Sequence, residues 1–295
     1  MHANPVERVR DANPVDNPGL DLVQELMSRG HAKLHIGRDV QKQIEHTFDI
    51  SRGFFARTSP EKHAFALPSF VEGYRELGVE YSQQPDRPDL TESFSVWNRN
   101  RVRTDEAGWV ASCPLHAEMR HTIDVLSPLM AELFQSLADR LAPGSVGPRF
   151  KQASYLQVNY YEPAQHRREM LQDGHEDGHL VTLVTATGPG LEIELEDGYQ
   201  PVELAADEML VMPGSLLTLM TGGAVQPLFH QVKNSFRKDP RYSMMFFVNP
   251  DGDQVLEPWV RNETNAGIDI IAEANKLPLK FGLPTLVDGT SGRGR

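Results

Sequence analysis

The sequence is poor in three features, and each absence excludes a class of protein. Only one cysteine, Cys113, occurs in 295 residues, so no disulfide can form within the chain, and a reducing compartment such as the cytoplasm is expected. No apolar run approaches the length needed to cross a bilayer, and the polar amino terminus lacks the hydrophobic core of a secretory signal. A basic excess is also missing: the formal net charge of −12 argues against a nucleic-acid partner. We therefore expect a globular protein that acts on neither membranes nor nucleic acids.

The chain from about residue 20 to 145 has mostly helical patterning. Leu22, Val23 and Leu26 recur at helical spacing, and a second helix is expected from about 40 to 55. A long apolar stripe from 115 to 141 predicts a third helix, interrupted only by a Ser-Pro pair. Between them, "ESFSVW" alternates as a β-strand does. This half therefore predicts a helical flank with one or more strands.

Beyond residue 150 the hydrophobic period changes to two, which is typical of β-strands. The candidate strands are "YLQVNYY", "GLEIELEDGYQPVEL", "EMLVMPG", "SLLTLMTGG", "LFHQVKN" and "RYSMMFFVN". Many short strands preceded by helices predict an α+β fold with a mainly β core, a sandwich or barrel. Because no linker divides the chain, we expect one domain over 1–295, with its β core at 150–250 and a carboxy-terminal segment at 251–295.

The segment "GHEDGH" fits two incompatible metal motifs. As HExxH it would be a zinc peptidase site, with His175 and His179 as ligands and Glu176 as base. As HxD it supplies His175 and Asp177, two of the three ligands of the facial triad that binds iron(II) in oxygenases. A zinc HExxH must lie on a helix, because only there do positions i and i+4 share one face. The two motifs therefore make opposite predictions about local structure.

Composition favours the extended form. Five of the seven residues from Val181 to Thr187 are Val or Thr, and a Gly-Pro-Gly break follows. In a strand, His175 and Asp177 point to one side, whereas His179 lies roughly 13 Å from His175, too far to share an ion. The third ligand must then come from a neighbouring strand, and His230 in "QPLFHQVKN" is the best-placed histidine.

A second pair of polar residues lies a short distance after His230. In the candidate strand "RYSMMFFVNP", Arg241 and Ser243 share one face and present a guanidinium and a hydroxyl, which suit a carboxylate. A lone Arg-x-Ser is most often a surface arginine beside a core strand. Here the pair follows the candidate metal ligands, which favours a binding role.

These motifs, in this order, resemble the isopenicillin N synthase-like branch of the 2-oxoglutarate- and iron(II)-dependent oxygenases. The matching segments are "NYYEP", "HEDGHLVTLV", "GPGLEI", "VMPGS", "MTGG", "HQV" and "RYSMMFFVNP", over about residues 150 to 250. The amino-terminal half resembles the family more loosely, through "RGFFARTSPEKHAF", "EGYRELGVE" and "DLTESFSV". It departs where relatives read G-F-F and this chain has Gly30-His31-Ala32. The segment "AQHRREMLQDG" before the HxD also looks inserted.

The resemblance implies a double-stranded β-helix, or jelly-roll barrel, flanked by amino- and carboxy-terminal helices. It implies that His175, Asp177 and His230 bind Fe(II). It further implies that Arg241 and Ser243 hold the distal carboxylate of 2-oxoglutarate, with Asn159 and Tyr161 lining the same cosubstrate.

The implied activity is a dioxygenase that uses O2 and 2-oxoglutarate to oxidise a carbon of a small molecule, releasing succinate and CO2. Hydroxylation is the default outcome, and desaturation or cyclisation is the alternative. An oxidase of the same fold that does not use 2-oxoglutarate, a zinc peptidase and a non-catalytic small-molecule binding protein are the competing hypotheses.

Arg75, Arg99, Arg101 and Arg103 are candidate contacts to an acidic substrate, although arginines of this kind are usually exposed and solvated.

Overall fold

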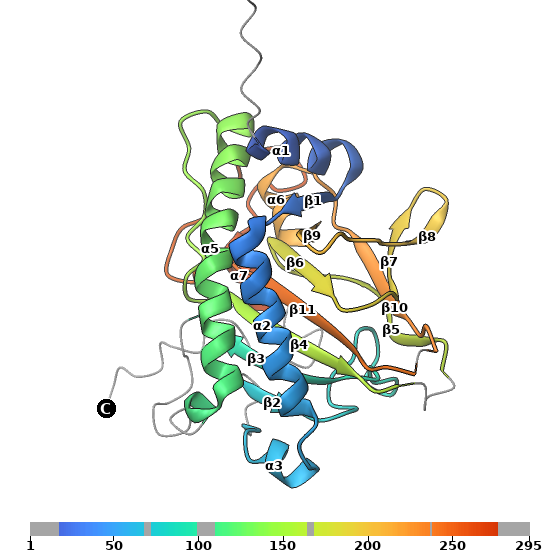
Figure 1. Cartoon of the computed structure of the whole chain (residues 1–295). Helices are drawn as coiled ribbons and strands as arrows, with labels where there is room; N and C mark the ends of the chain where they lie inside the picture. Colours follow the sequence, from blue (N-terminus) through green and yellow to red (C-terminus); the bar gives the residue numbers. More distant parts are fainter. Residues whose placement is uncertain (1–17, 68–71, 99–109, 164–167, 237, 277–295) are drawn as a thin grey trace, which may run out of the picture.

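Two antiparallel β-sheets form the core of the protein (Figure 1). The structure is a computed structural model that describes residues 18–67, 72–98, 110–163, 168–236 and 238–276. The larger sheet has seven strands in the order β1-β9-β6-β11-β4-β3-β2, and the smaller has four in the order β5-β10-β7-β8. Together they form the double-stranded β-helix core, which confirms the predicted mainly β fold with helical flanks.

The strands are β1 (Ala32–His35), β2 (Gly73–Arg75), β3 (Glu92–Trp97), β4 (Tyr155–Tyr161), β5 (Met170–Glu176), β6 (Val181–Ala186), β7 (Leu191–Leu195), β8 (Gly198–Pro201), β9 (Glu208–Pro213), β10 (Phe229–Lys233) and β11 (Arg241–Val248). The helices are α1 (Pro18–Arg29), α2 (Gly37–Phe55), α3 (Ser59–His63), α5 (Pro114–Leu141), α6 (Ser215–Met220) and α7 (Ile270–Lys276), with a short 3-10 turn at Val110–Ser112. The three predicted amino-terminal helices correspond to α1, α2 and α5 within a few residues. The single-domain expectation stays a prediction.

Helices α2 and α5 lie side by side and cover the seven-stranded sheet on the side away from the smaller sheet (Figure 1). The predicted apolar stripe of α5 is buried: Met119 and Leu126 are fully inaccessible to solvent. Between the two helices, the Thr47 and Thr122 hydroxyls are hydrogen-bonded at 2.7 Å. Burial of these apolar faces fixes one side of the large sheet and leaves its other side to face the smaller sheet.

One predicted strand is wrong. The run "SLLTLMTGG" forms helix α6 followed by a turn, and it buries Leu216, Leu217 and Met220. A short continuous apolar run does not distinguish a buried strand from a buried helix by itself, and the i, i+1, i+4 spacing of these residues fits a helix. Strand β1, which pairs with β9, was not predicted from the pattern at all.

The strand register determines which polar residues meet. In β11 and β4 the facing pairs include Arg241 with Tyr161 and Ser243 with Asn159. In the smaller sheet, β10 pairs with β5 so that His230 faces His175. Residues separated by tens of positions in the sequence therefore occupy neighbouring places on the two sheets.

Among the described residues, none of the helices combines the length and the apolar character that a membrane span requires.

Candidate metal centre and the adjoining pocket

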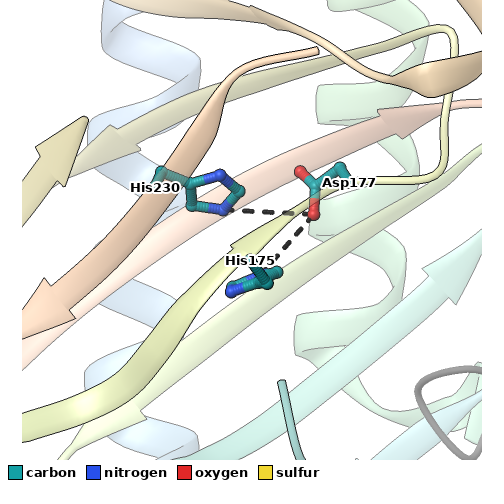
Figure 2. Close-up of side chains that lie close together, drawn as sticks. All are labelled: His175, Asp177 and His230. Atoms are coloured by element: carbon teal, nitrogen blue, oxygen red, sulfur yellow. Dashed lines mark ion pairs between the residues drawn. The ribbon is translucent and has the colours of Figure 1, made fainter. Parts of the chain in front are cut away.

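Three side chains converge between the two sheets (Figure 2). His175 is near the end of β5, Asp177 follows directly after that strand, and His230 lies on β10. Nε2 of His175 is 3.7 Å from Oδ1 of Asp177, and Nε2 of His230 is 4.0 Å from the same oxygen. One ligand atom from each residue lies within 4.8 Å of the other two, and within the described residues this is the one such group of His, Cys, Asp and Glu.

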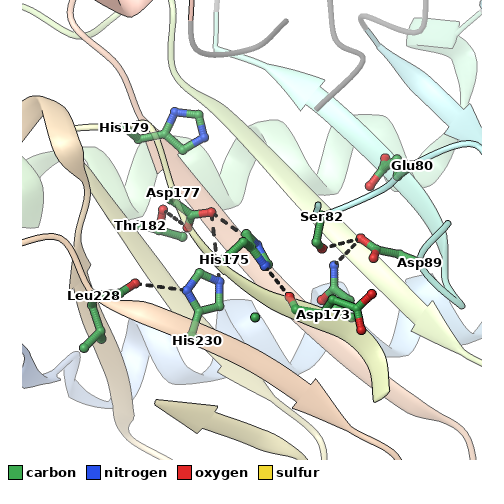
Figure 3. A network of polar contacts seen from close by, with 12 residues as sticks. Glu80, Ser82, Asp89, Asp173, His175, Asp177, His179, Thr182, Leu228 and His230 are labelled. Carbon is green, nitrogen blue, oxygen red and sulfur yellow. Dashed lines mark hydrogen bonds and ion pairs between the residues drawn. The ribbon is translucent and has the colours of Figure 1, made fainter. Parts of the chain in front are cut away.

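Both imidazole rings are oriented by the backbone. Nδ1 of His175 is 2.8 Å from the carbonyl of Asp173, and Nδ1 of His230 is 3.3 Å from the carbonyl of Leu228 (Figure 3). A carbonyl only accepts, so each Nδ1 carries the hydrogen and each Nε2 keeps its lone pair. The two lone pairs are therefore directed to the side where the Asp177 carboxylate lies, as in a site that binds a metal through Nε2.

The charge state of the cluster also suits a cation. Burial lowers the pKa of His230 to about 4, with the neighbouring His175 adding to the effect, so the ring is neutral near pH 7. Burial alone would raise the pKa of Asp177, but His230, His175, His179 and the hydroxyl of Thr182 outweigh it and hold this pKa below its ordinary value. Thr182 Oγ1 donates to Asp177 Oδ2 at 2.7 Å. The site thus combines an ionised carboxylate with an uncharged imidazole.

The remaining histidine of the HEDGH motif, His179, has other partners. Its Nδ1 lies 2.8 Å from the Asn249 side-chain oxygen, and its Nε2 lies 3.3 Å from the hydroxyl of Tyr155. The segment 175–179 contains the end of a strand and a bend, not a helix. The HExxH arrangement needed for a zinc peptidase is therefore absent from this segment.

A pocket adjoins the cluster, and its walls come from both sheets. The inward-facing residues of β11 and β4 contribute to it in register: Arg241, Ser243, Met245 and Phe247 from β11, and Tyr155, Gln157 and Asn159 from β4. The loop between β2 and β3 adds Glu80, Tyr81, Ser82 and Asp89, and β5 adds Gln172. One end of this surface presents hydrogen-bonding groups, and the other presents the stacked rings of Tyr155 and Phe247, whose centroids are 4.7 Å apart.

Arg241 is the cation at the polar end of the pocket. It is 5% exposed, and its Nε donates to the carbonyl of Pro189 at 3.0 Å, while Nη1 has no hydrogen-bond partner among the described residues. Its guanidinium carbon lies 4.9 Å from the centroid of the Tyr161 ring. Burial lowers the pKa of Arg241, yet arginine stays protonated in proteins. A buried guanidinium with an unpartnered nitrogen is well suited to a carboxylate ligand.

The other predicted carboxylate contacts surround this arginine. Ser243 and Asn159 line the pocket. Tyr161 is only 2% exposed and lies against them, with its hydroxyl 3.3 Å from Asn159 Nδ2 and 3.5 Å from Ser243 Oγ. The structure therefore brings all seven residues named from the sequence to one pocket or its immediate wall. Their roles as ligands stay predictions.

Of the four arginines proposed to meet an acidic substrate, only Arg75 lies within the described residues, and its guanidinium has partners within the protein. Arg75 is 2% exposed, contrary to the expectation of a solvated side chain, and it forms an ion pair with Glu80 and a hydrogen bond with Gln157. It is buried although β2 is the edge strand of the larger sheet, and Glu80 neutralises its charge. Arg99, Arg101 and Arg103 lie outside the described residues.

Sequence reasoning did not identify Thr182 or Gln172. A threonine five residues after Asp177 stands in the "HLVTLV" run, but only the fold shows that its hydroxyl contacts the carboxylate. Gln172 lies in the segment "AQHRREMLQDG", which looked inserted in the sequence. In the structure Gln172 is part of strand β5.

Comparison with known proteins agrees with this geometry. Residues 153–250 match the family model of the 2OG-Fe(II) oxygenase superfamily. Gibberellin 20 oxidase 1-B of Triticum aestivum is 30% identical over 139 residues, which are 45% of this chain and 38% of the wheat protein. Isopenicillin N synthase of Penicillium rubens is 29% identical over 113 residues, 36% of this chain and 33% of that protein. The chain thus matches well under half the length of these curated relatives.

Solved structures share the fold over most of the chain. A full-length Neurospora crassa protein in complex with alpha-KG superposes with a TM-score of 0.70 at 18% identity, over 86% of this chain and 88% of that one. A 2OG-Fe(II) oxygenase family protein from Caulobacter crescentus also gives 0.70, at 21% identity, over 86% and 91%.

Proposed function

Because residues 153–250 carry a 2OG-Fe(II) oxygenase domain of the isopenicillin N synthase-like type, we propose that this protein is a 2-oxoglutarate- and Fe(II)-dependent dioxygenase. Its substrate in this proposal is a small molecule, and its reaction is the oxidation of an unactivated carbon. Hydroxylation is the default outcome, with desaturation or cyclisation as variants of the same chemistry. One observation carries the proposal: two imidazole Nε2 atoms and a carboxylate converge beside a buried arginine that has an unpartnered nitrogen.

The donor set fits Fe(II). His175, Asp177 and His230 would supply two nitrogen ligands and one oxygen ligand, the combination typical of non-haem iron sites that keep open positions. The backbone carbonyls behind both rings and the Thr182 hydroxyl behind the carboxylate would hold the three ligands in place.

The polar end of the pocket fits the keto acid. Arg241 would pair with the distal carboxylate of 2-oxoglutarate and Ser243 would donate its hydroxyl to it, with Asn159 and Tyr161 completing the wall. The charge of the cosubstrate would balance a guanidinium that is otherwise buried with one nitrogen unpaired.

When bound, Fe(II) and 2-oxoglutarate supply the activation of O2, and the keto acid is released as succinate and CO2. The chain's own contribution is binding, orientation and exclusion of water. The aromatic end of the pocket, with Tyr155 and Phe247, is positioned to hold the substrate on the side of the cluster away from Arg241. Which substrate carbon is oxidised would then depend on how this end of the pocket orients the molecule.

A second candidate keeps the fold and the iron but not the keto acid. Isopenicillin N synthase is among the similar proteins, and an oxidase of the same fold that does not use 2-oxoglutarate is one of the hypotheses raised by the sequence. In that case Arg241 and Ser243 would bind the carboxylate of the substrate itself.

The test is a stoichiometric assay on the full chain. Protein purified without O2 is analysed for metal, loaded with Fe(II) and 2-oxoglutarate, and screened with small molecules for stimulated succinate release. We expect succinate formation that requires Fe(II) and O2 and that is abolished in Asp177→Ala. Substrate oxidation without 2-oxoglutarate consumption would favour the second candidate. Retained zinc with O2-independent hydrolysis of peptides would refute both.

A further inference from the structure

A chain of polar side chains runs along the pocket wall beside Arg241. Its members are connected by hydrogen bonds in which chemistry fixes the donor and the acceptor. In order, they are Glu80, Gln157, Asn159, Tyr161, Gln172 and Asp89. A carboxyl group stands at each end of this series of side chains. The donor and the acceptor of every hydrogen bond between the two carboxyl groups can therefore be assigned.

The Asp89 end fixes the amide of Gln172. Oδ2 of Asp89 accepts from Ser82 Oγ at 2.7 Å and from Gln172 Nε2 at 3.2 Å (Figure 3 shows Ser82 beside Asp89). Burial raises the pKa of Asp89, and both donors contact Oδ2, which leaves Oδ1 as the oxygen without a hydrogen-bond partner among the described residues. The amide nitrogen of Gln172 therefore faces Asp89, and its oxygen faces Tyr161.

The Glu80 end fixes the amides of β4. Gln157 Nε2 donates to Glu80 Oε2 at 3.0 Å and to Asn159 Oδ1 at 2.8 Å. With its oxygen held by Gln157, Asn159 directs its amide nitrogen at the Tyr161 hydroxyl, 3.3 Å away. The Tyr161 oxygen is thus approached by a donor from this side and must serve as an acceptor there.

The Tyr161 hydroxyl has one hydrogen, and the assignments made from the Asp89 end and from the Glu80 end both direct that hydrogen to Gln172. Tyr161 donates to Gln172 Oε1 at 2.7 Å, which is the shortest bond that this hydroxyl makes. Ser243 Oγ donates in turn to the Tyr161 oxygen at 3.5 Å. The Ser243 hydrogen is therefore directed at the Tyr161 oxygen, and the Tyr161 hydrogen is directed at Gln172 Oε1.

We propose that Gln172 weakens the binding of the keto acid by drawing the Tyr161 hydroxyl hydrogen away from the carboxylate-binding face. A carboxylate bound at Arg241 attracts the hydroxyl hydrogens of Ser243 and Tyr161. While Gln172 accepts from Tyr161, the tyrosine hydrogen is not available to a bound carboxylate, and turning it toward one leaves the Gln172 oxygen without a donor. This inference rests on the proposed function, since it names a residue that sets the affinity for the proposed cosubstrate.

The test measures 2-oxoglutarate binding directly. Full-length protein is loaded with Mn(II) in place of iron, so that no turnover occurs, and the dissociation constant for 2-oxoglutarate is measured by calorimetry. Gln172→Met keeps the length of the side chain and removes the acceptor amide. We expect this variant to bind 2-oxoglutarate roughly fivefold to 150-fold more tightly, the range that corresponds to one unmet buried hydrogen bond.

A double variant separates this effect from general repacking. Tyr161→Phe removes the hydroxyl hydrogen for which Gln172 and the carboxylate both act as acceptors. Adding Gln172→Met to this variant should therefore change the affinity for 2-oxoglutarate by less than about twofold. Gln172→Leu serves if Gln172→Met does not give a cooperative melt. Gln200→Met on β8, an exposed glutamine of the same sheet, is the matched control and should bind as the wild type does.

The outcomes distinguish the two proposals. This inference alone is overturned if the wild-type protein binds 2-oxoglutarate and both Gln172 variants bind it equally or more weakly. It is also overturned if Gln172→Met still tightens 2-oxoglutarate binding in the Tyr161→Phe background. Failure of the wild-type protein to bind 2-oxoglutarate overturns the proposed function, and this inference with it.

Discussion

The contact between Thr182 and Asp177 gives a sharp test of how the candidate metal centre is organised. Thr182 is fully buried on β6, and its hydroxyl donates to the carboxylate oxygen of Asp177 at 2.7 Å. Thr182→Val replaces that hydroxyl with a methyl group, so the carboxylate loses its donor while the shape of the side chain is nearly kept. We expect the variant to fold and to bind divalent metal less tightly.

The magnitude follows from the bond that is removed. A hydrogen bond to a charged group contributes about 1.5–3 kcal/mol, which corresponds to roughly tenfold to 150-fold in a binding constant. Loss of a group that orients a metal ligand typically costs about 10–100-fold in metal affinity, in agreement with this range. Because the hydroxyl helps to lower the pKa of Asp177, its loss should raise that pKa and move the pH midpoint of metal binding to higher pH.

The assay is calorimetric titration of metal-free protein with Mn(II) and, without O2, with Fe(II), repeated between about pH 5 and about pH 8. Thr182→Ser is the matched control, because it keeps the hydroxyl and loses only the methyl group, and it should retain most of the affinity. Metal affinity within about threefold of wild type in Thr182→Val would refute the reasoning. So would an equal loss in both variants, since packing rather than the hydrogen bond would then be responsible.

Three further predictions concern the same region. Arg241→Met should raise the dissociation constant for 2-oxoglutarate by at least about thirtyfold, because the carboxylate loses its partner. Its Mn(II) affinity should stay within about threefold of the wild-type value. A 2-oxoglutarate affinity equal to that of the wild type in calorimetry would contradict this prediction. The pKa of His230 is lowered to about 4, so between about pH 6.5 and this value the unfolded chain binds more protons than the folded protein does. The metal-free protein should therefore lose stability as the pH falls through that window. Denaturant unfolding from about pH 7 to about pH 4 that shows no decline would count against it. Gly214→Ala would place a Cβ 2.3 Å from the carbonyl oxygens of Asp177 and His179, so the free energy of unfolding should fall by about 2 kcal/mol or more; an unchanged melting temperature would show that the backbone adjusts there.

Some features of the protein could be read without coordinates because they depend on local pattern. The switch from helical to period-two spacing near residue 150 predicted the β core, and the burial of Met119 and Leu126 follows from the stripe that predicted α5. Where local pattern is ambiguous, prediction was wrong: the run that forms α6 is short and mostly apolar, and the choice between strand and helix was made by how it packs.

The environment of charged residues was a second source of error. Arg75 resembles any solvated arginine in the sequence, but its charge is buried against Glu80 from the following loop. Only the fold shows which acidic group lies next to it, and here Glu80 offsets the cost of burying the charge.

By itself, the sequence predicted the fold class and five of the seven polar residues at the pocket, because spacing within a strand decides which side chains share a face. The family resemblance supplied the other two, Asn159 and Tyr161. The tertiary structure alone decided which of these residues meet. The pairing of β5 with β10 places His230 opposite His175, and the pairing of β4 with β11 places Tyr161 opposite Arg241. It also decided the directions of the hydrogen bonds from Thr182 and Gln172, because these depend on contacts between segments that no local pattern records.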